Sequence, residues 1–428
     1  MKITAVGDAI ITRRIPENYA GYAELAPIIS EGDARFFNLE TTLHRAGENF
    51  GNEASGGTWI RSEPEVLDDL LPFGFNMTSF NNNHVMDYSF AGLLSTLSYV
   101  EKSGLIHSGV GRNLREASRP AYLDTPNGRV ALLSVNTTLQ GLMCAGNETP
   151  FVPGRPGANP VRSRQIITLA EEDYAALSSI IDRTKINDGH NIERREGYHG
   201  GPLVGMTEVG PVLFKKGSET KARLELDQRD LARIKATIEE ARANADYVLF
   251  SVHSHQTDVE KEEPTEFLRE LCHYIIDCGA DAVLGHGPHL LRPIEVYRDR
   301  PIFYSLGDFV LQLYGISEVP ADMYEQYGVS PDMGVEALVA KRSNNYTRGL
   351  MADRRMFVTV IPVIEMEGGK LLSLRLYPVL ADMDVGSPTL GLPRLSHDEH
   401  LLDDFIARCA RYGTTVTRNA DGSYSCTW

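Results

Sequence analysis

Short apolar runs that end abruptly in polar residues are the most regular pattern along this chain. Their length and their β-branched or aromatic content favour buried strands, over residues 2–6, 35–38, 75–80, 247–252 and 282–284. Stretches with apolar side chains three to four residues apart lie between these runs. They predict helices over residues 64–71, 90–103, 228–243 and 264–277. Strands that alternate with helices predict βαβ units and an α/β fold.

Turn residues predict antiparallel hairpins at the edges of the sheets. Pairs of strand-like runs are joined by short turns that contain Gly, Asn or Asp, within residues 121–135, 293–305 and 357–377. We therefore expect parallel sheets with antiparallel edges.

Three long segments have no clear period, residues 137–160, 187–220 and 315–355. Segments of this length favour lids or binding loops, with surface decoration as the alternative. We expect one domain over residues 1–378 with insertions at about 137–220 and 311–355. A helix followed by a hairpin is expected to form a C-terminal extension over residues 379–428.

The charge balance limits the partners of this protein. The 428 residues include 42 Lys and Arg and 58 Asp and Glu, for a net charge of −16. A nucleic-acid backbone or an anionic membrane would be repelled, whereas an anionic small molecule could still bind beside a dication. No stretch reaches the roughly 20 apolar residues of a membrane helix, and the five cysteines show no CxxC spacing. We expect a cytoplasmic protein with a small-molecule or short peptide-like substrate, whose oligomeric state is open, a homo-oligomer included.

Polar side chains recur where the predicted strands end. A lone Asp there is usually a cap, and a lone His is usually a hydrogen-bonded structural residue. The recurrence changes this interpretation, because parallel strands bring their carboxyl ends to one edge. Carboxylates, an amide oxygen and imidazoles suit one or two divalent ions, with Mn, Zn or Fe favoured over Mg or Ca. The residues concerned are Asp8, Glu40, Asn83, His84, His253, His255, His286 and His289.

Several motifs together carry a family resemblance. They are Gly7-Asp8, Asn38-Leu39-Glu40, Asn82-Asn83-His84 with Asp87, the sequence VHSH around His253, Gly285-His286-Gly287-Pro288-His289 and Ser305-Leu306-Gly307-Asp308-Phe309. In order and context they resemble the CapA-type poly-γ-glutamate capsule proteins, which are similar to calcineurin-like metallophosphoesterases. The resemblance covers about residues 2–310. It implies a sandwich of two mixed β-sheets flanked by helices.

The resemblance also implies a role for each motif residue. Glu40 would take the place of a bridging Asp, and Asn83 would bind a metal through its side-chain oxygen. His84 would protonate a leaving group, and Asp87 would orient His84. The remaining implied metal ligands are Asp8, His253, His286 and His289.

Two positions depart from the motifs of the families that the chain resembles. Ile10 stands where the wider superfamily usually has a His, so one metal is expected to bind more weakly or to complete its shell with water. His255 stands where much of the CapA branch has Gly. As residues two apart on a strand, His255 and His253 would point the same way. His255 could then be an extra ligand, a substrate contact or a proton shuttle, with a structural histidine as the alternative.

Substrate recognition is expected to lie in the long loops. Arg155 and Arg162 are candidates for an anion clamp, because guanidinium matches carboxylate and phosphate oxygens. His199, within the sequence YHGG, is a candidate wall of the pocket. Solvated surface residues are the alternative for all three.

Three functions are compatible with the sequence. The first is a metal-dependent hydrolase of an amide or γ-glutamyl-type bond, or of a phosphoester. The second is a non-hydrolytic component of poly-γ-glutamate synthesis or export. The third is a metal-binding module without turnover, which the presence of His84 beside Asn83 disfavours.

Overall fold

The computed structural model describes residues 1–201 and 203–428 and divides them into two compact units. Unit 1 comprises Met1–Pro160 and Arg233–Trp428, and unit 2 comprises Val161–Ala232. Residues 137–160, predicted to begin an insertion, therefore belong to the larger unit.

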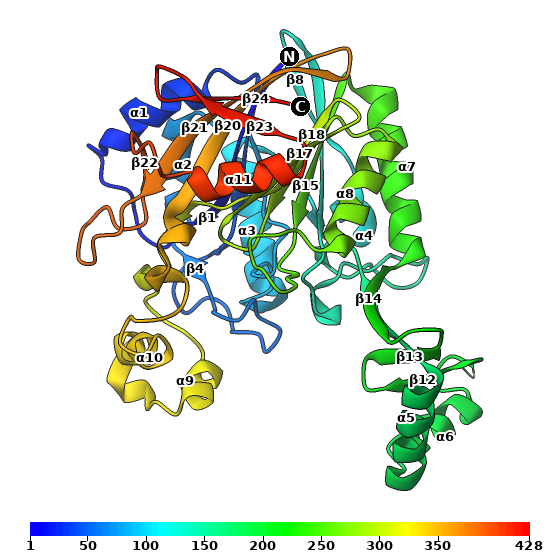
Figure 1. Cartoon of the computed structure of the whole chain (residues 1–428). Helices are drawn as coiled ribbons and strands as arrows, with labels where there is room; N and C mark the ends of the chain where they lie inside the picture. Colours follow the sequence, from blue (N-terminus) through cyan, green and yellow to red (C-terminus); the bar gives the residue numbers. More distant parts are fainter. Residues whose placement is uncertain (202) are drawn as a thin grey trace. The chain divides into compact units, whose positions relative to one another are not determined.

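The first sheet of unit 1 is mixed (Figure 1). Its central strand β1 pairs in parallel with β2 and β19 and antiparallel with β20. In spatial order the main path contains β23 (Thr415–Arg418), β24 (Tyr424–Thr427), β21 (Lys370–Ala381), β20 (Val358–Glu367), β1 (Lys2–Ile10), β2 (Ala34–Leu39), β5 (Met77–Ser79) and β6 (Ile106–Ser108). Two further strands pair beside this path, β19 (Asp308–Leu311) and β22 (Pro393–Leu395).

The second sheet of unit 1 has parallel central strands and antiparallel edges. Its order is β17 (Leu291–Tyr297), β18 (Arg300–Leu306), β16 (Ala282–His286), β15 (Tyr247–His253), β9 (Gly128–Asn136) and β8 (Ala121–Thr125). The hairpins β8–β9, β17–β18 and β20–β21 are antiparallel, which confirms the predictions from turn residues.

The two sheets share one apolar core. Phe36 of the first sheet and Leu249 and Phe303 of the second are fully buried in the same cluster. Strand residues that alternate between faces supply this inner layer. The α/β sandwich of two mixed sheets flanked by helices is thus confirmed.

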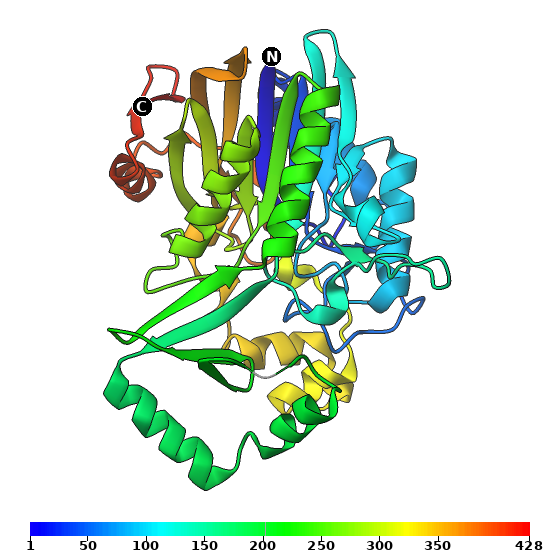
Figure 2. The ribbon, with the colours of Figure 1, turned by 90° about the vertical axis from the view of Figure 1, so that its right-hand side faces the viewer.

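Helices cover the outer faces of unit 1. Figure 2 shows α7 and α8 lying along the second sheet, and α1, α2 and α3 share a buried cluster with Phe37 and Leu39 of the first. The bounds are α1 (Ala20–Ile29), α2 (Val66–Leu70), α3 (Ser89–Ser103), α4 (Leu114–Ser118), α7 (Gln228–Asn244), α8 (Glu266–Cys278) and α11 (Asp403–Arg411). Within the described residues, no helix combines the length and the apolar content that crossing a bilayer requires.

Smaller elements complete unit 1. The segment between β19 and β20 contains two helices, whose buried Met323 and Leu338 pack in one apolar cluster. These helices are α9 (Ala321–Tyr327) and α10 (Gly334–Arg342). Short strand pairs are β3 (Thr42–Leu43) with β4 (Arg61–Ser62), and β7 (Val110–Gly111) with β10 (Gly157–Ala158). Short 3₁₀ helices cover Leu71–Phe73, Gly141–Met143, Leu313–Gly315, Pro331–Met333, Leu350–Ala352 and Arg354–Phe357.

Unit 2 is a small sheet with helices. Its strand order is β12 (Met206–Val209), β13 (Val212–Lys216), β11 (Ser163–Leu169) and β14 (Lys221–Leu226). The helices are α5 (Glu171–Thr184) and α6 (Asp188–Glu196), and neither has a buried residue.

Candidate metal centre

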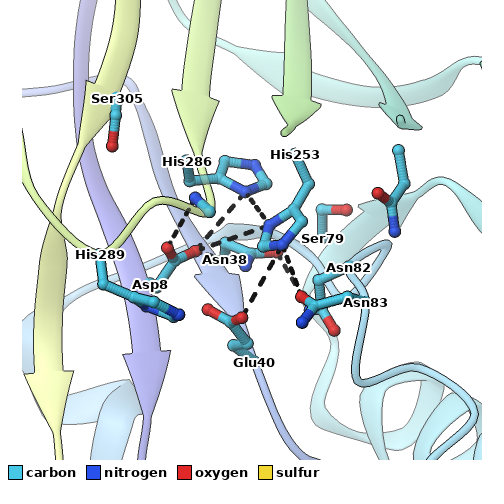
Figure 3. Close-up of polar contacts among 12 residues, drawn as sticks. Asp8, Asn38, Glu40, Ser79, Asn82, Asn83, His253, His286, His289 and Ser305 are labelled. Carbon is cyan, nitrogen blue, oxygen red and sulfur yellow. Dashed lines mark hydrogen bonds and ion pairs between the residues drawn. The ribbon is translucent and has the colours of Figure 1, made fainter. Parts of the chain in front are cut away.

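The polar strand ends of unit 1 meet at one place. Figure 3 shows Asp8 of β1, His253 of β15 and His286 of β16 pointing toward one another, with Glu40 directly after β2. The pairs β1–β2 and β15–β16 are both parallel, so each pair brings its two carboxyl ends together. Across the two sheets, Oδ1 of Asp8 lies 3.5 Å from Nδ1 of His286. Segments that are distant in sequence thus contribute to one cluster.

Glycines allow this close approach. A Cβ at Gly7 would lie 1.8 Å from the carbonyl oxygen of Gly307, so no other residue fits there without a backbone shift. Gly287 has φ +121°, and its amide donates to Oδ2 of Asp8 at 2.9 Å. The side-chain amide of Asn38 donates from Nδ2 to the other carboxylate oxygen of Asp8, Oδ1, at 2.7 Å. The carboxylate of Asp8 is therefore fixed by the fold.

Three carboxylates are buried together at the centre. Asp8, Glu40 and Asp308 are each 0% exposed. One donor atom from each residue lies within 4.8 Å of the others in the group Asp8, Glu40, His289 and Asp308. Burial and the nearby Asp308 raise the pKa of Asp8 to about 7, and burial with Asp8 and Asp308 raises the pKa of Glu40 well above its usual value. Packing carboxylates this closely is unfavourable without a compensating positive charge.

Unpartnered oxygens mark the place for that charge. Both carboxylate oxygens of Glu40, and Oδ2 of Asp308, have no hydrogen-bond partner within the described part of the chain. Buried polar atoms normally have such partners, and a missing ion is one explanation when they do not.

Neutral imidazoles face the carboxylates. Nε2 of His253 lies 2.8 Å from Oδ1 of Asn83 and 3.0 Å from Nε2 of His255. Burial and the neighbouring histidines lower the pKa values of His253 and His255 well below the usual value, and burial lowers the pKa of His286 to about 3. Uncharged rings offer lone pairs, which is the form that binds metals.

The donor set fits one or two divalent ions. Glu40 belongs to a group with Asp308 and His289, and also to a group with His253 and His255. Its Oε1 lies 3.8 Å from Nε2 of His253. Mixed carboxylate and imidazole donors suit Mn, Zn or Fe. Ile10, the position at which the resemblance led us to expect a weaker metal site, is buried in an apolar cluster.

His84 and Asp87 form a pair beside the carboxylates. Nδ1 of His84 lies 2.7 Å from Oδ2 of Asp87, and Asp87 also accepts the amides of Gly56 and Ile60, each at 2.8 Å. Nε2 of His84 lies 3.8 Å from Oε1 of Glu40. The pair thus holds the free edge of the His84 ring toward the centre.

Asp308 is a further candidate metal ligand, and the motif of residues 305–309 had suggested no role for it. It begins β19 and pairs in register with Asp8 of β1. Its Oδ1 lies 3.0 Å from Nδ1 of His289. Burial alone would lower the pKa of His289, but the charge and hydrogen bond of Asp308 raise it. The Gly-Asp dipeptide at residues 307–308 repeats that at residues 7–8, but Gly32-Asp33 has the same sequence, so the dipeptide alone does not identify Asp308.

The predicted substrate residues lie outside the donor cluster. Arg155 in unit 1 is exposed and donates from Nε to the carbonyl of Cys144 at 3.0 Å. Arg162 in unit 2 forms a bidentate ion pair with Asp230, at 2.6 and 2.9 Å. His199, also in unit 2, lies 3.0 Å from Glu193. Their role in binding substrate stays a prediction.

This chain is similar in sequence or in structure to several known proteins. The family described as "Bacterial capsule synthesis protein PGA_cap" matches residues 2–313. "Uncharacterized protein y4sH" of Sinorhizobium fredii is 32% identical, over 97% of this chain and 90% of that protein. "Capsule biosynthesis protein CapA" of Bacillus anthracis is 22% identical, over 72% of this chain and 59% of that protein. A solved structure, described as that of a novel phosphatase from Mycoplasma pneumoniae, has a TM-score of 0.42 and 9% identity, covering 89% of this chain and 94% of that one.

Proposed function

This chain belongs to the bacterial capsule synthesis protein PGA_cap family, and from that premise we propose that it is a metal-dependent hydrolase. Its substrate is a small anionic molecule with an amide, γ-glutamyl-type or phosphoester bond. The observation that carries the proposal is the carboxylate of Glu40, fully buried with both oxygens unpartnered among the described residues, between other carboxylates and neutral imidazoles. A purely structural carboxylate would be hydrogen-bonded.

One or two divalent ions would be held by the donors that converge on Glu40. A bound divalent ion supplies water with a lowered pKa and stabilises negative charge that develops on the substrate. The proposed ligands are Asp8, Glu40, Asn83, His253, His286, His289 and Asp308.

His84 is the proposed proton donor. Asp87 accepts from Nδ1 of His84, which fixes the ring and leaves Nε2 facing the carboxylates. A proton on Nε2 can pass to the leaving group as the bond breaks. Asp87 acts through His84 and is therefore a positioning residue.

His255 lies at the more open side of the donor cluster. Its side chain is 25% exposed, whereas that of His253 is fully buried, and its Nε2 lies 3.1 Å from Oδ1 of Asn83. This position suits a ligand that also meets the substrate. Contacts from Arg155, Arg162 and His199 to the anionic part of the substrate remain our prediction from the sequence.

A second function is favoured by the names of relatives. "PGA biosynthesis protein CapA" of Bacillus subtilis is 25% identical over 59% of this chain and 46% of that protein. A non-hydrolytic role in poly-γ-glutamate synthesis or export would use the same centre to hold an anionic chain without cleaving it.

Metal analysis and a hydrolysis screen distinguish the two functions. The purified chain would be assayed with p-nitrophenyl phosphates and γ-glutamyl p-nitroanilide, each with added Mn or Zn. Turnover that disappears in His84→Asn while bound metal is retained supports the hydrolase. Bound metal without turnover of any substrate supports the non-hydrolytic role, and absence of bound metal contradicts both.

A further inference from the structure

A second cavity lies in unit 1, within the segment that joins β19 to β20. Its volume is about 360 Å³, and residues of α9 and α10 form part of its wall. Most lining side chains are apolar, among them Leu313, Ile316, Met323, Leu338, Val339 and Met351. Small-molecule sites have this volume range and this apolar lining.

Two arginines also line the cavity. Arg342 donates to the hydroxyl of Thr58, and its guanidinium lies 6.0 Å from the centre of the Tyr327 ring. Arg348 is exposed. Among the residues that the structure describes, neither guanidinium has a carboxylate within ion-pair distance.

What both guanidinium groups lack among the described residues is a carboxylate, since Arg342 does contact Thr58 and Tyr327. Acidic residues outnumber basic ones by 58 to 42. The neighbouring Arg354 pairs with Asp398, and Arg355 pairs with Asp353. Two arginines that line an apolar cavity, with no carboxylate partner among the described residues, can pair with an anion from outside the chain.

The turn between Arg342 and Arg348 has an unusual backbone conformation. Asn344, Asn345 and Tyr346 have φ values of 50°, 55° and 63°, which is the left-handed region. The ring of Tyr346 packs edge-on against Tyr314, a residue of the cavity wall, with ring centres 5.1 Å apart. A left-handed tyrosine is unfavourable by itself, and such residues persist where packing fixes them, often at ligand clamps.

We propose that this cavity binds a small molecule with an apolar body and one anionic group. The apolar walls remove the body from water, and the guanidinium groups of Arg342 and Arg348 bind the carboxylate, sulfonate or phosphate. This site is separate from the metal centre, and the inference stands whether or not the chain is a hydrolase.

One loop joins the wall of this separate cavity to the surroundings of the metal centre. Thr58 lies between Gly56 and Ile60, whose amides both donate to Asp87. A ligand that contacts Thr58 therefore touches the loop that positions Asp87, the partner of His84.

Fluorescence of two probes tests the proposal on the full chain. Anilinonaphthalene sulfonate has apolar rings and one anionic group, and phenylnaphthylamine is its uncharged counterpart. We expect one equivalent of the sulfonate to bind the folded protein. Arg342→Gln and Arg348→Gln should each weaken this binding about tenfold, the typical effect of losing a charge-assisted hydrogen bond. The uncharged probe should bind these variants as it binds the unchanged protein.

Two further variants complete the test. Val339→Phe, which fills the cavity, should abolish binding of both probes, and near-UV circular dichroism would verify its fold. Arg115→Gln, at a side chain that is 87% exposed on α4, should bind as the unchanged protein does. The proposal is overturned if neither Arg342→Gln nor Arg348→Gln changes the affinity for the sulfonate, or if Arg115→Gln lowers that affinity equally. It is also overturned if Val339→Phe folds and still binds the probes.

Discussion

Two groups of histidine and carboxylate side chains in this protein have similar chemistry and opposite surroundings. In unit 1, Glu40 and His253 are 0% exposed and converge with other donors. In unit 2, Oε2 of Glu193 lies 3.0 Å from Nε2 of His199 and 3.5 Å from Nδ1 of His190. The side chains of this second group are about half exposed, at 49–53%.

The two groups differ in whether solvent water solvates the carboxylate. The exposed Glu193 is solvated and paired with histidines, so it requires no ion, and such pairs contribute little to stability. The side chain of Glu40 has no exposed surface, and its oxygens are unpartnered within the described chain. A dication offsets the cost of burying Glu40, whereas Glu193 has no such cost to offset. Burial with unpartnered oxygens, more than residue type, therefore distinguishes the centre from the exposed group.

The largest expected effect comes from Glu40→Gln, which keeps the shape of the side chain and removes its charge. Because Glu40 belongs to two of the three donor groups that the described residues form at the centre, we expect loss of bound metal and of all turnover, measured by mass spectrometry of metals and by the hydrolysis assay. Glu193→Gln is the matched control and should change neither. Equal metal content in the two variants would contradict the comparison.

Much of the centre could be predicted from the sequence because its ligands follow local strand patterns. Asp8, Glu40, Asn83, His253 and His289 each come near the end of an apolar run, and the fold brings them together. Parallel strands have the same direction, so their ends meet whatever the order of the strands.

Asp308 could not be placed in this way. Its position depends on the pairing of β19 with β1, about 300 residues away in sequence, and no local period encodes such pairing. An insertion was predicted at about residues 137–220, but the strands and helices of unit 2 were not, for a related reason. Its strands β11 and β14 pair across some 50 intervening residues, and α5 has no buried face to give an apolar period. The helix α10 was not predicted either, because it is short and is stabilised by tertiary packing of Leu338.

The next largest effect is expected for His84→Asn. Loss of a positioned proton donor should lower kcat by about 10²–10⁴-fold. Bound metal should be retained, because Glu40 and the other carboxylates remain. Asp87→Asn should give a smaller loss of kcat and a changed pH profile, since it acts only by orienting the ring. If His84→Asn instead loses metal with unchanged kcat per ion, His84 is a ligand and not a donor.

Removing metal should destabilise unit 1 by a moderate amount. An ion present at a hundredfold its Kd stabilises the state that binds it by about 2.7 kcal/mol. Hydrogen exchange with Mn and then with a chelator should show faster exchange in β1 and β15 after chelation. Exchange in α6, which holds His190 and Glu193, should stay the same. Equal changes in both regions would remove the distinction between the buried and exposed groups.

The smallest effect is expected for His199→Ala. The exposed pair with Glu193 contributes less than about 1 kcal/mol, so the thermal midpoint and the bound metal should be unchanged. If His199 contacts substrate, as predicted from the sequence, KM should rise while kcat is kept, because only binding common to ground state and transition state is lost. An unchanged KM would exclude that contact. A fall in bound metal would show that exposed histidines also hold an ion here, and burial would then no longer separate the two groups.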